Sequence, residues 1–273
     1  MRVALRRPGS EIRKNYYDGS RRSDGFTSES MDAHREYLRN AVPGTGWILR
    51  AFHNGRIRDF ADFIDEGGGR VLSVGCGTGE LEKRFLAEKF DEVYGLEPVG
   101  EKLRNFDGTD VQAIQGAVPP IPFEDDSLDA VVAVGVTEHL PDEHGFLTDA
   151  IRCLRPGGNI YLTIPIEVGT GGLIRHLGRS VASPKRKITS NDWRRFFEYS
   201  TEELLKQTSR DAHGTSHKYY NYRYAAKDLN RYYEDVTLVG WPFDPLKTTN
   251  LILFAKARAP EAATTDPVSV TNA

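Results

Sequence analysis

The sequence has few cysteines, no long apolar run and no excess of charge of one sign. Its 273 residues include two cysteines, Cys76 and Cys153, without the close Cys or His spacing of a zinc site or a disulfide framework. No apolar run approaches the roughly 18 residues that span a bilayer, and the first residues lack the apolar core of a secretory signal. We therefore expect a cytoplasmic protein with no integral membrane segment.

The balance of charge limits the class of partner. There are 36 basic and 39 acidic residues, which gives a formal net charge of -3. A nucleic-acid-binding protein usually carries a strong basic surface, and this molecule as a whole has no such excess. We expect no nucleic-acid partner, and any basic surface must be local.

The middle of the sequence alternates between strand-like and helix-like segments. Short apolar runs are typical of buried parallel strands, and they occur at 70–74, 92–96, 111–115, 128–134 and 159–164. Helical patterns lie between them at 80–89, 101–105 and 146–154, after a first helical region within 31–64. This alternation predicts a doubly wound α/β sheet with right-handed crossovers. Two final runs, 236–241 and 250–257, are separated by a short turn and should pair antiparallel.

The same pattern divides the chain into segments. We expect a flexible segment over 1–30, a domain over 31–258 and a disordered tail over 259–273. Between 168 and 234 the alternation stops and the chain becomes polar, aromatic and basic, which indicates an insertion between the fifth and sixth strands. Within it, Ser200 and Glu203 match a capping box at a helix start. No internal repeat occurs.

A glycine-rich stretch follows the first strand. Residues 71–80 read VLSVGCGTGE, and glycine at alternate positions lets the backbone approach a ligand closely. A tight strand-to-helix turn with no ligand is the plainer interpretation. However, Glu97 ends the next strand about 20 residues later, where a carboxylate accepts hydrogen bonds from ribose hydroxyls. Together the two features predict an adenosine-containing ligand.

Four segments in this order resemble class I S-adenosylmethionine-dependent methyltransferases of the small-molecule type: VLSVGCGTGE, VYGLEP, IPFEDDSLDAVVAVGVTEHLPD and LRPGGNIYLTIP. The resemblance covers residues 70 to 165 and is weak beyond them. It implies S-adenosyl-L-methionine as cofactor and a seven-stranded sheet with the last strand antiparallel. The cofactor-binding residues that it implies are Gly75, Cys76, Gly77, Thr78, Gly79, Glu97, Pro98, Ala117 and Gly135. At Ala117 the family often has an Asp that reaches the adenine, and here that contact must come from the backbone or be absent.

The candidate catalytic residues are Glu138 and His139, after the fourth strand. Methyl transfer depends mainly on positioning, and a base is needed only if the nucleophile must lose a proton. His139 is a candidate base, or it caps the following helix. Some related O-methyltransferases bind a metal through E-x-x-E-H at this place, but Gly135 replaces the first carboxylate, so we expect no metal.

The insertion is expected to contact the acceptor, because loops at the carboxyl ends of strands carry specificity in such sheets. Its basic residues favour an anionic or lipid- or glycan-linked small molecule, with peripheral membrane contact in the lipid-linked case, although a solvated basic surface is the alternative. The candidate substrate-binding residues are Tyr16, Tyr17, His176, His217 and Lys218. The oligomeric state is left open.

Three other functions were weighed. An NAD-linked oxidoreductase usually has G-x-G-x-x-G, whereas this loop has Gly75-x-Gly77-x-Gly79. Methyltransferases that modify the amino groups of nucleic-acid bases have an Asn/Asp-Pro-Pro-aromatic motif after the fourth strand, where this sequence has VTEH. A scaffold that binds the cofactor without catalysis is the third alternative, and it would bind without transferring a methyl group.

Overall fold

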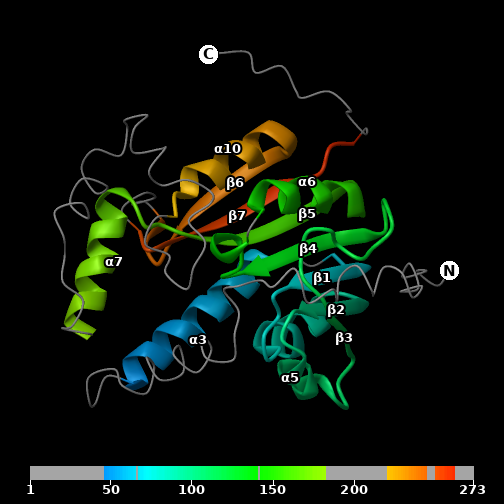
Figure 1. The fold of residues 1–273 in the computed structure, drawn as a ribbon, viewed down its shortest axis with the longest axis horizontal. Helices are drawn as coiled ribbons and strands as arrows, with labels where there is room; N and C mark the ends of the chain where they lie inside the picture. The colour runs from blue at the N-terminus through cyan, green and yellow to red at the C-terminus, as the bar shows by residue number, and fades with distance from the viewer. Residues whose placement is uncertain (1–45, 66, 141, 183–219, 245–249, 262–273) are drawn as a thin grey trace, which may run out of the picture.

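The protein is built on a seven-stranded sheet (Figure 1). The computed structural model describes residues 46–65, 67–140, 142–182, 220–244 and 250–261. The strand order is β3-β2-β1-β4-β5-β7-β6. The strands are β1 (Arg70–Val74), β2 (Glu92–Glu97), β3 (Val111–Gln115), β4 (Leu128–Val134), β5 (Leu154–Pro165), β6 (Glu234–Trp241) and β7 (Ile252–Arg258). Strand β7 pairs antiparallel with β5 and β6, and the other pairs are parallel. The predicted sheet, with its antiparallel last strand, is confirmed.

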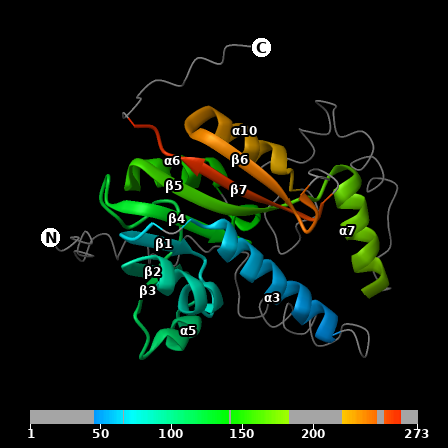
Figure 2. The same ribbon diagram turned by 180° about the vertical axis from the view of Figure 1, so that it is seen from behind.

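Helices cover both faces of this sheet (Figures 1 and 2). One face carries α6 (Glu143–Cys153) and α10 (Tyr222–Tyr232). The opposite face carries the second half of α3 (Gly46–Phe63), the π-helix η1 (Glu82–Leu86), α4 (Ala87–Lys89), α5 (Gly100–Leu103) and the 3-10 helix η2 (Arg104–Phe106). Two more helices lie at the carboxyl ends of the strands: the 3-10 helix η3 (Thr137–His139) and α7 (Gly169–Ala182).

Each face of the sheet has its own apolar core because strand side chains alternate between faces. In β1, Leu72 and Val74 belong to the core under α6 and α10, whereas Val71 belongs to the core under α3. The stripe predicted for the first helical region is confirmed, since Ile57, Phe60, Ala61 and Ile64 are all buried. Burial of whole side chains of this size contributes about 1.5–3 kcal/mol each, so the two cores fix the position of the strand ends.

The structure differs from the sequence prediction at three helices. The sequence predicts Leu154 as the last residue of the helix over 146–154, but Leu154 is the first residue of β5, because it pairs with Leu128 of β4. Two helices that the sequence did not predict, α7 and α10, lie in the region 168–234. The expected helix start at Ser200 lies outside the described residues.

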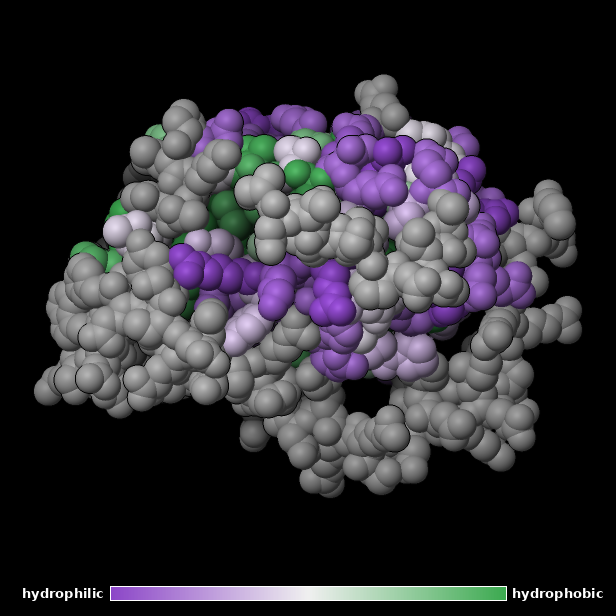
Figure 3. Space-filling view, turned by 90° about the horizontal axis from the view of Figure 1, so that it is seen from above, coloured by the Kyte–Doolittle hydropathy of each residue, from purple (hydrophilic) through white to green (hydrophobic). Residues whose placement is uncertain are grey.

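The carboxyl ends of β1, β2, β4 and β5 meet at one edge of the sheet, which places the loops after them together. Helices α3 and α7 project beyond this edge in both ribbon views (Figures 1 and 2). Seen from above, the described surface is mostly hydrophilic, and hydrophobic residues show in smaller areas between hydrophilic ones (Figure 3). None of the described helices combines the length and apolar character that a membrane span requires.

Candidate active site

The glycine loop after β1 is held in a backbone conformation that requires glycine. Gly75, Gly77 and Gly79 have φ of +67°, +59° and +80°, a region that costs other L-residues about 1–2 kcal/mol. A Cβ on Gly75 would lie 2.5 Å from Cγ2 of Val136, and one on Gly79 would lie 2.5 Å from the Phe106 ring. The outer two glycines therefore allow close packing within the protein.

Gly77 has a different role, because among the described residues no atom beyond its chain neighbours lies within 4 Å of the place that its Cβ would take. Its N–H donates a hydrogen bond to Oε2 of Glu97 at 3.0 Å, so the middle of the loop lies against the end of β2. The open space beside Gly77 is therefore bordered by a buried carboxylate. This arrangement fits a ligand that carries hydroxyl groups.

Glu97 is 3% exposed and accepts hydrogen bonds from three neighbouring donors. Its Oε1 accepts from the Val99 N–H at 3.1 Å and from Nζ of Lys102 at 2.9 Å, in addition to the Gly77 contact at Oε2. A carboxylate has about four acceptor positions, so three protein donors leave about one. Two ribose hydroxyls need two acceptor positions, so one of the three protein donors must move away. Lys102 is the one donor that belongs to a flexible side chain, because the other two are backbone N–H groups.

The other residues predicted for the cofactor lie around this loop. Cys76 is buried, and burial raises the pKa of its thiol, which keeps it protonated. Thr78 and Ala117 are exposed, and Pro98 is half-buried beside Glu97. Gly135, with φ of +64°, donates its N–H to Oγ1 of Thr163 on β5 at 2.8 Å. The structure thus brings the predicted set to the carboxyl edge of the sheet.

A buried pair lies behind the loop. Ser73 on β1 donates a hydrogen bond to Oε1 of Glu82 at 2.5 Å, and both residues are 2% exposed. Burial raises the pKa of Glu82 to about 7, although the Ser73 hydrogen bond opposes the shift. Glu82 follows the glycine loop directly, so this pair joins the start of the helical segment to β1. The signal in the sequence was a serine inside an apolar strand, because a buried polar group needs a partner.

The predicted catalytic residues form η3, directly after β4. Glu138 and His139 are half-buried, and the His139 N–H donates to the Val136 carbonyl at 2.8 Å. The alternative role of His139 as a helix cap is wrong, since Asp142 caps α6 through a bond from the Gly145 N–H at 2.7 Å.

A tyrosine holds this turn against α6. The hydroxyl of Tyr220 donates to Oε1 of Glu143 at 2.6 Å and lies 3.4 Å from Oγ1 of Thr137. Burial raises the pKa of Tyr220 well above its usual value, and the nearby charge of Glu143 adds to this. Tyr220 lies two residues before α10 and within the region 168–234, so this part of the insertion is tied to the turn that contains Glu138.

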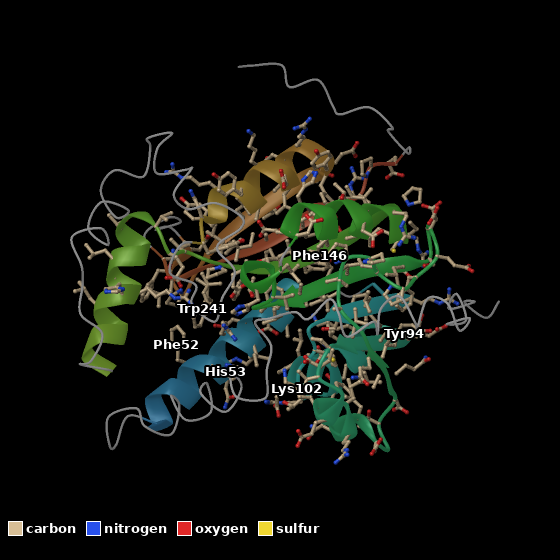
Figure 4. The ribbon with its side chains drawn as sticks, in the orientation of Figure 1. Phe52, His53, Tyr94, Lys102, Phe146 and Trp241 are labelled. Atoms are coloured by element: carbon tan, nitrogen blue, oxygen red, sulfur yellow. The ribbon has the colours of Figure 1, made fainter. Side chains whose placement is uncertain are left out.

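Charged side chains from α3 and α7 lie beyond β4 and β5. Nε of Arg175 is 3.1 Å from Oε1 of the buried Glu167, without the alignment of a hydrogen bond, and its Nη1 donates to the Leu251 carbonyl at 2.9 Å. Burial lowers the pKa of Arg56, Glu138 raises it and Arg175 lowers it again. His176, a predicted substrate residue, is 9% exposed on α7. Phe52 of α3 lies beside Trp241 at this end, with ring centroids 4.7 Å apart (Figure 4).

Several predicted residues lie outside the described part of the chain: Tyr16, Tyr17, His217 and Lys218. Among the residues that are described, no group of three or more His, Cys, Asp or Glu side chains is arranged to hold a metal ion. Sequence reasoning did not identify Arg56, Lys102 or Tyr220. No motif marks any of them, because their roles depend on contacts between distant elements.

The comparisons with known proteins agree with this geometry. A family model described as "Methyltransferase domain" matches residues 72–162. An uncharacterized methyltransferase of Mycobacterium bovis is 34% identical over 114 residues, which are 41% of this chain and 46% of that protein. A tRNA U34 carboxymethyltransferase of Methylococcus capsulatus is 31% identical over 39% of this chain and 35% of its own length. The chain thus spans less than half the length of these relatives.

Solved structures share the fold at low sequence identity. A Haloferax volcanii protein described as a methyltransferase, solved in complex with the Trm112 methyltransferase activator, has a TM-score of 0.52 and 19% identity over 86% of this chain and 97% of its own. A Listeria monocytogenes protein described as an S-adenosylmethionine-dependent methyltransferase has a TM-score of 0.52 and 14% identity, over 77% of this chain and 100% of its own. The glycine loop, the strand order and the sequence match together show that the chain carries a class I, S-adenosylmethionine-dependent methyltransferase domain with a Rossmann-like fold.

Proposed function

We propose that the protein transfers a methyl group from S-adenosylmethionine to a small-molecule acceptor. The observation that carries this proposal is the open space beside Gly77, bordered by the buried Glu97, in a domain of the methyltransferase family. A Cβ at Gly77 would enter that space, and Glu97 offers the acceptor oxygens that a ribose needs. The residues present therefore fit the cofactor.

Each part of the site has a distinct task in this proposal. The cofactor supplies an activated methyl group on a sulfonium. The glycine loop and Gly135 leave room for the cofactor, Glu97 accepts from the ribose hydroxyls, and Lys102 turns away to free an acceptor position. Glu138 or His139 takes a proton from an acceptor that must lose one. The rest of the rate enhancement comes from holding donor and acceptor in line.

The acceptor is proposed to be anionic, or linked to a lipid or glycan. The basic residues of the insertion support this, and the run from Lys185 to Lys187 lies outside the described residues. The likeness to tRNA-modifying relatives covers 35% of the Methylococcus protein, so it carries no acceptor to this chain. The net charge of -3 also gives no support to a nucleic-acid acceptor.

A transfer assay tests the proposal. The protein is incubated with S-adenosylmethionine labelled in the methyl group and with a small-molecule extract, and label is followed into the extract. We expect label in a small molecule with the wild type and none with Gly77→Ala. Cofactor binding without transfer to any member of a broad acceptor panel would instead favour the non-catalytic scaffold, and binding of NAD in place of S-adenosylmethionine would favour the oxidoreductase.

A further inference from the structure

Arg56 has few hydrogen-bond partners among the described residues for its positively charged side chain. It lies on α3, just before the residues that pack on the sheet, and its side chain is half-buried. Its Nε is buried with no hydrogen-bond partner among the described residues. The one hydrogen-bond contact recorded for the side chain is marginal, with Nη2 at 3.5 Å from Nδ1 of His53. An arginine offers five donors, so most of its binding capacity is unused.

None of the described charged groups near Arg56 forms an ion pair with its guanidinium. Among the described residues, no carboxylate oxygen lies within the 4.0 Å of an ion pair with Arg56. Glu138 favours its charged form from a greater distance, whereas Arg175 opposes it. Arg175 itself is engaged by Glu167 and the Leu251 carbonyl. The two guanidinium groups are thus close enough to influence each other, and within the described residues Arg56 forms no ion pair.

The position of Arg56 relates it to the reaction. Glu138, whose charge it senses, belongs to the turn after β4, and the loop residues Gly135 and Val136 join that turn to the glycine loop through the Val136 packing on Gly75. Arg56 thus lies on the side of this turn where α3 and α7 project beyond the sheet. A group bound there would lie within the electrostatic influence of Glu138, one of the candidate bases.

We propose that Arg56 binds an anionic group of the methyl acceptor, a carboxylate or a phosphate, through Nε and one Nη. The planar guanidinium matches such an oxyanion with two parallel hydrogen bonds. Arg175 adds positive potential without leaving Glu167. This inference rests on the proposed function and deepens it, because it names the recognised group and the residue that recognises it.

The experiment measures anion binding to the full chain saturated with S-adenosylhomocysteine. Inorganic phosphate and acetate are titrated separately at constant ionic strength, because exposed charges respond to salt alone. Binding is followed by NMR through the Nε–Hε signals of arginine, with the Arg56 signal identified by its loss in Arg56→Met. Arg58→Met is the matched control, since Arg58 lies on the same helix and its side chain is 68% exposed.

We expect at least one of the two anions to shift the Arg56 signal and to bind Arg56→Met at least tenfold more weakly, with Arg58→Met unchanged. Arg56→Lys should retain part of the affinity, because it keeps the charge and loses the planar fork. A response to acetate alone assigns a carboxylate, and a response to phosphate alone assigns a phosphate. Absence of binding by both anions, or equal binding by Arg56→Met, would overturn the inference.

The unfolding temperature of Arg56→Met distinguishes an anion-binding role of Arg56 from a structural role. If the unmet charge of Arg56 is kept for a ligand, Arg56→Met should unfold at the same temperature as the wild type or higher when no anion is present. A clear drop in that temperature, larger than for Arg58→Met, would show that Arg56 supports the fold through Glu138, and the inference would fail. Calorimetry with S-adenosylhomocysteine on the same samples tests the proposed function separately, because all three variants should bind it like the wild type.

Discussion

At the scale of single residues, the three loop glycines share a backbone conformation for different reasons. Gly75 and Gly79 make room for Val136 and Phe106 of the protein itself, whereas no side chain of the described residues enters the space beside Gly77. The sequence showed that the backbone must approach something, but it could not distinguish packing from ligand binding. That distinction depends on the positions of Val136, in the loop after β4, and Phe106, in η2.

A comparison of Gly77→Ala with Gly108→Ala distinguishes the cost of the left-handed backbone conformation from the loss of ligand binding. Gly108 also has a positive φ of +76°, and its Cβ would likewise meet no atom within 4 Å, but it lies in an exposed turn away from the loop. Both substitutions should lower the free energy of unfolding by about 1–2 kcal/mol, the cost of a left-handed conformation. We expect Gly77→Ala alone to weaken S-adenosylhomocysteine binding in calorimetry. Equal affinity in both variants would show that the ligand lies elsewhere.

Glu82 gives the protein a pH-dependent stability. Burial raises the pKa of Glu82 in the folded protein from 4.5 to about 7, so ionisation favours the unfolded state. Its stabilising contribution is complete below pH 4.5 and is lost as the pH rises to about 7. Glu82→Gln, which resembles the protonated form, should therefore exceed the wild type in free energy of unfolding by about 3 kcal/mol at pH 8, and by little at pH 4.

Denaturant unfolding across this pH range measures the difference, with Glu80→Gln as the control because its side chain is 54% exposed. A constant difference between pH 4 and pH 8 would mean that Glu82 ionises normally in the folded protein.

At the scale of elements, the strands and the helices between them could be predicted because burial leaves a period in the sequence. Strands β1, β3 and β4 have the predicted bounds. The pattern failed at α7 and α10, which lie in a region rich in polar residues. In α10, the buried face is made by Tyr222, Ala225, Asp228 and Leu229. Oδ2 of Asp228 is 3.1 Å from Nδ1 of His144 on α6. A polar residue therefore occupies a buried position of α10 at which the helical pattern predicts an apolar residue.

Two tyrosines that join α6 to α10 test how the turn after β4 is held. Tyr220 donates to the carboxylate of Glu143, whereas Tyr233 donates to the Leu147 carbonyl at 2.8 Å. A hydrogen bond to a charged group contributes about 1.5–3 kcal/mol and a neutral one about 0.5–1.5 kcal/mol. Tyr220→Phe should therefore lower the free energy of unfolding more than Tyr233→Phe does. Equal losses by denaturant unfolding would mean that the Glu143 contact contributes no more than a neutral bond.

At the scale of the whole molecule, the class of sheet could be predicted and the acceptor side could not. The alternating pattern predicts the parallel strands and crossovers that place the glycine loop, Glu97 and Gly135 at one edge, and the family resemblance implies the seven strands with the last one antiparallel. The proposed recognition of the acceptor depends on α3 and α7, which reach this edge from distant parts of the chain. Arg56 shows why: the pattern of α3 gives no sign that the charges of Glu138, after β4, and of Arg175, on α7, act on this residue.

The proposed cofactor site lies between Gly77 and Glu97, and one calorimetric titration tests whether S-adenosylmethionine binds there. S-adenosylmethionine and S-adenosylhomocysteine should each bind the wild type with a micromolar dissociation constant, about 7–9 kcal/mol. Glu97→Ala should weaken binding tenfold or more, because each lost charge-assisted hydrogen bond contributes about 1.5–3 kcal/mol. Glu101→Ala, which removes an exposed carboxylate on α5, should bind like the wild type. No heat from either ligand with folded wild-type protein, or unchanged affinity in Glu97→Ala, would contradict the account.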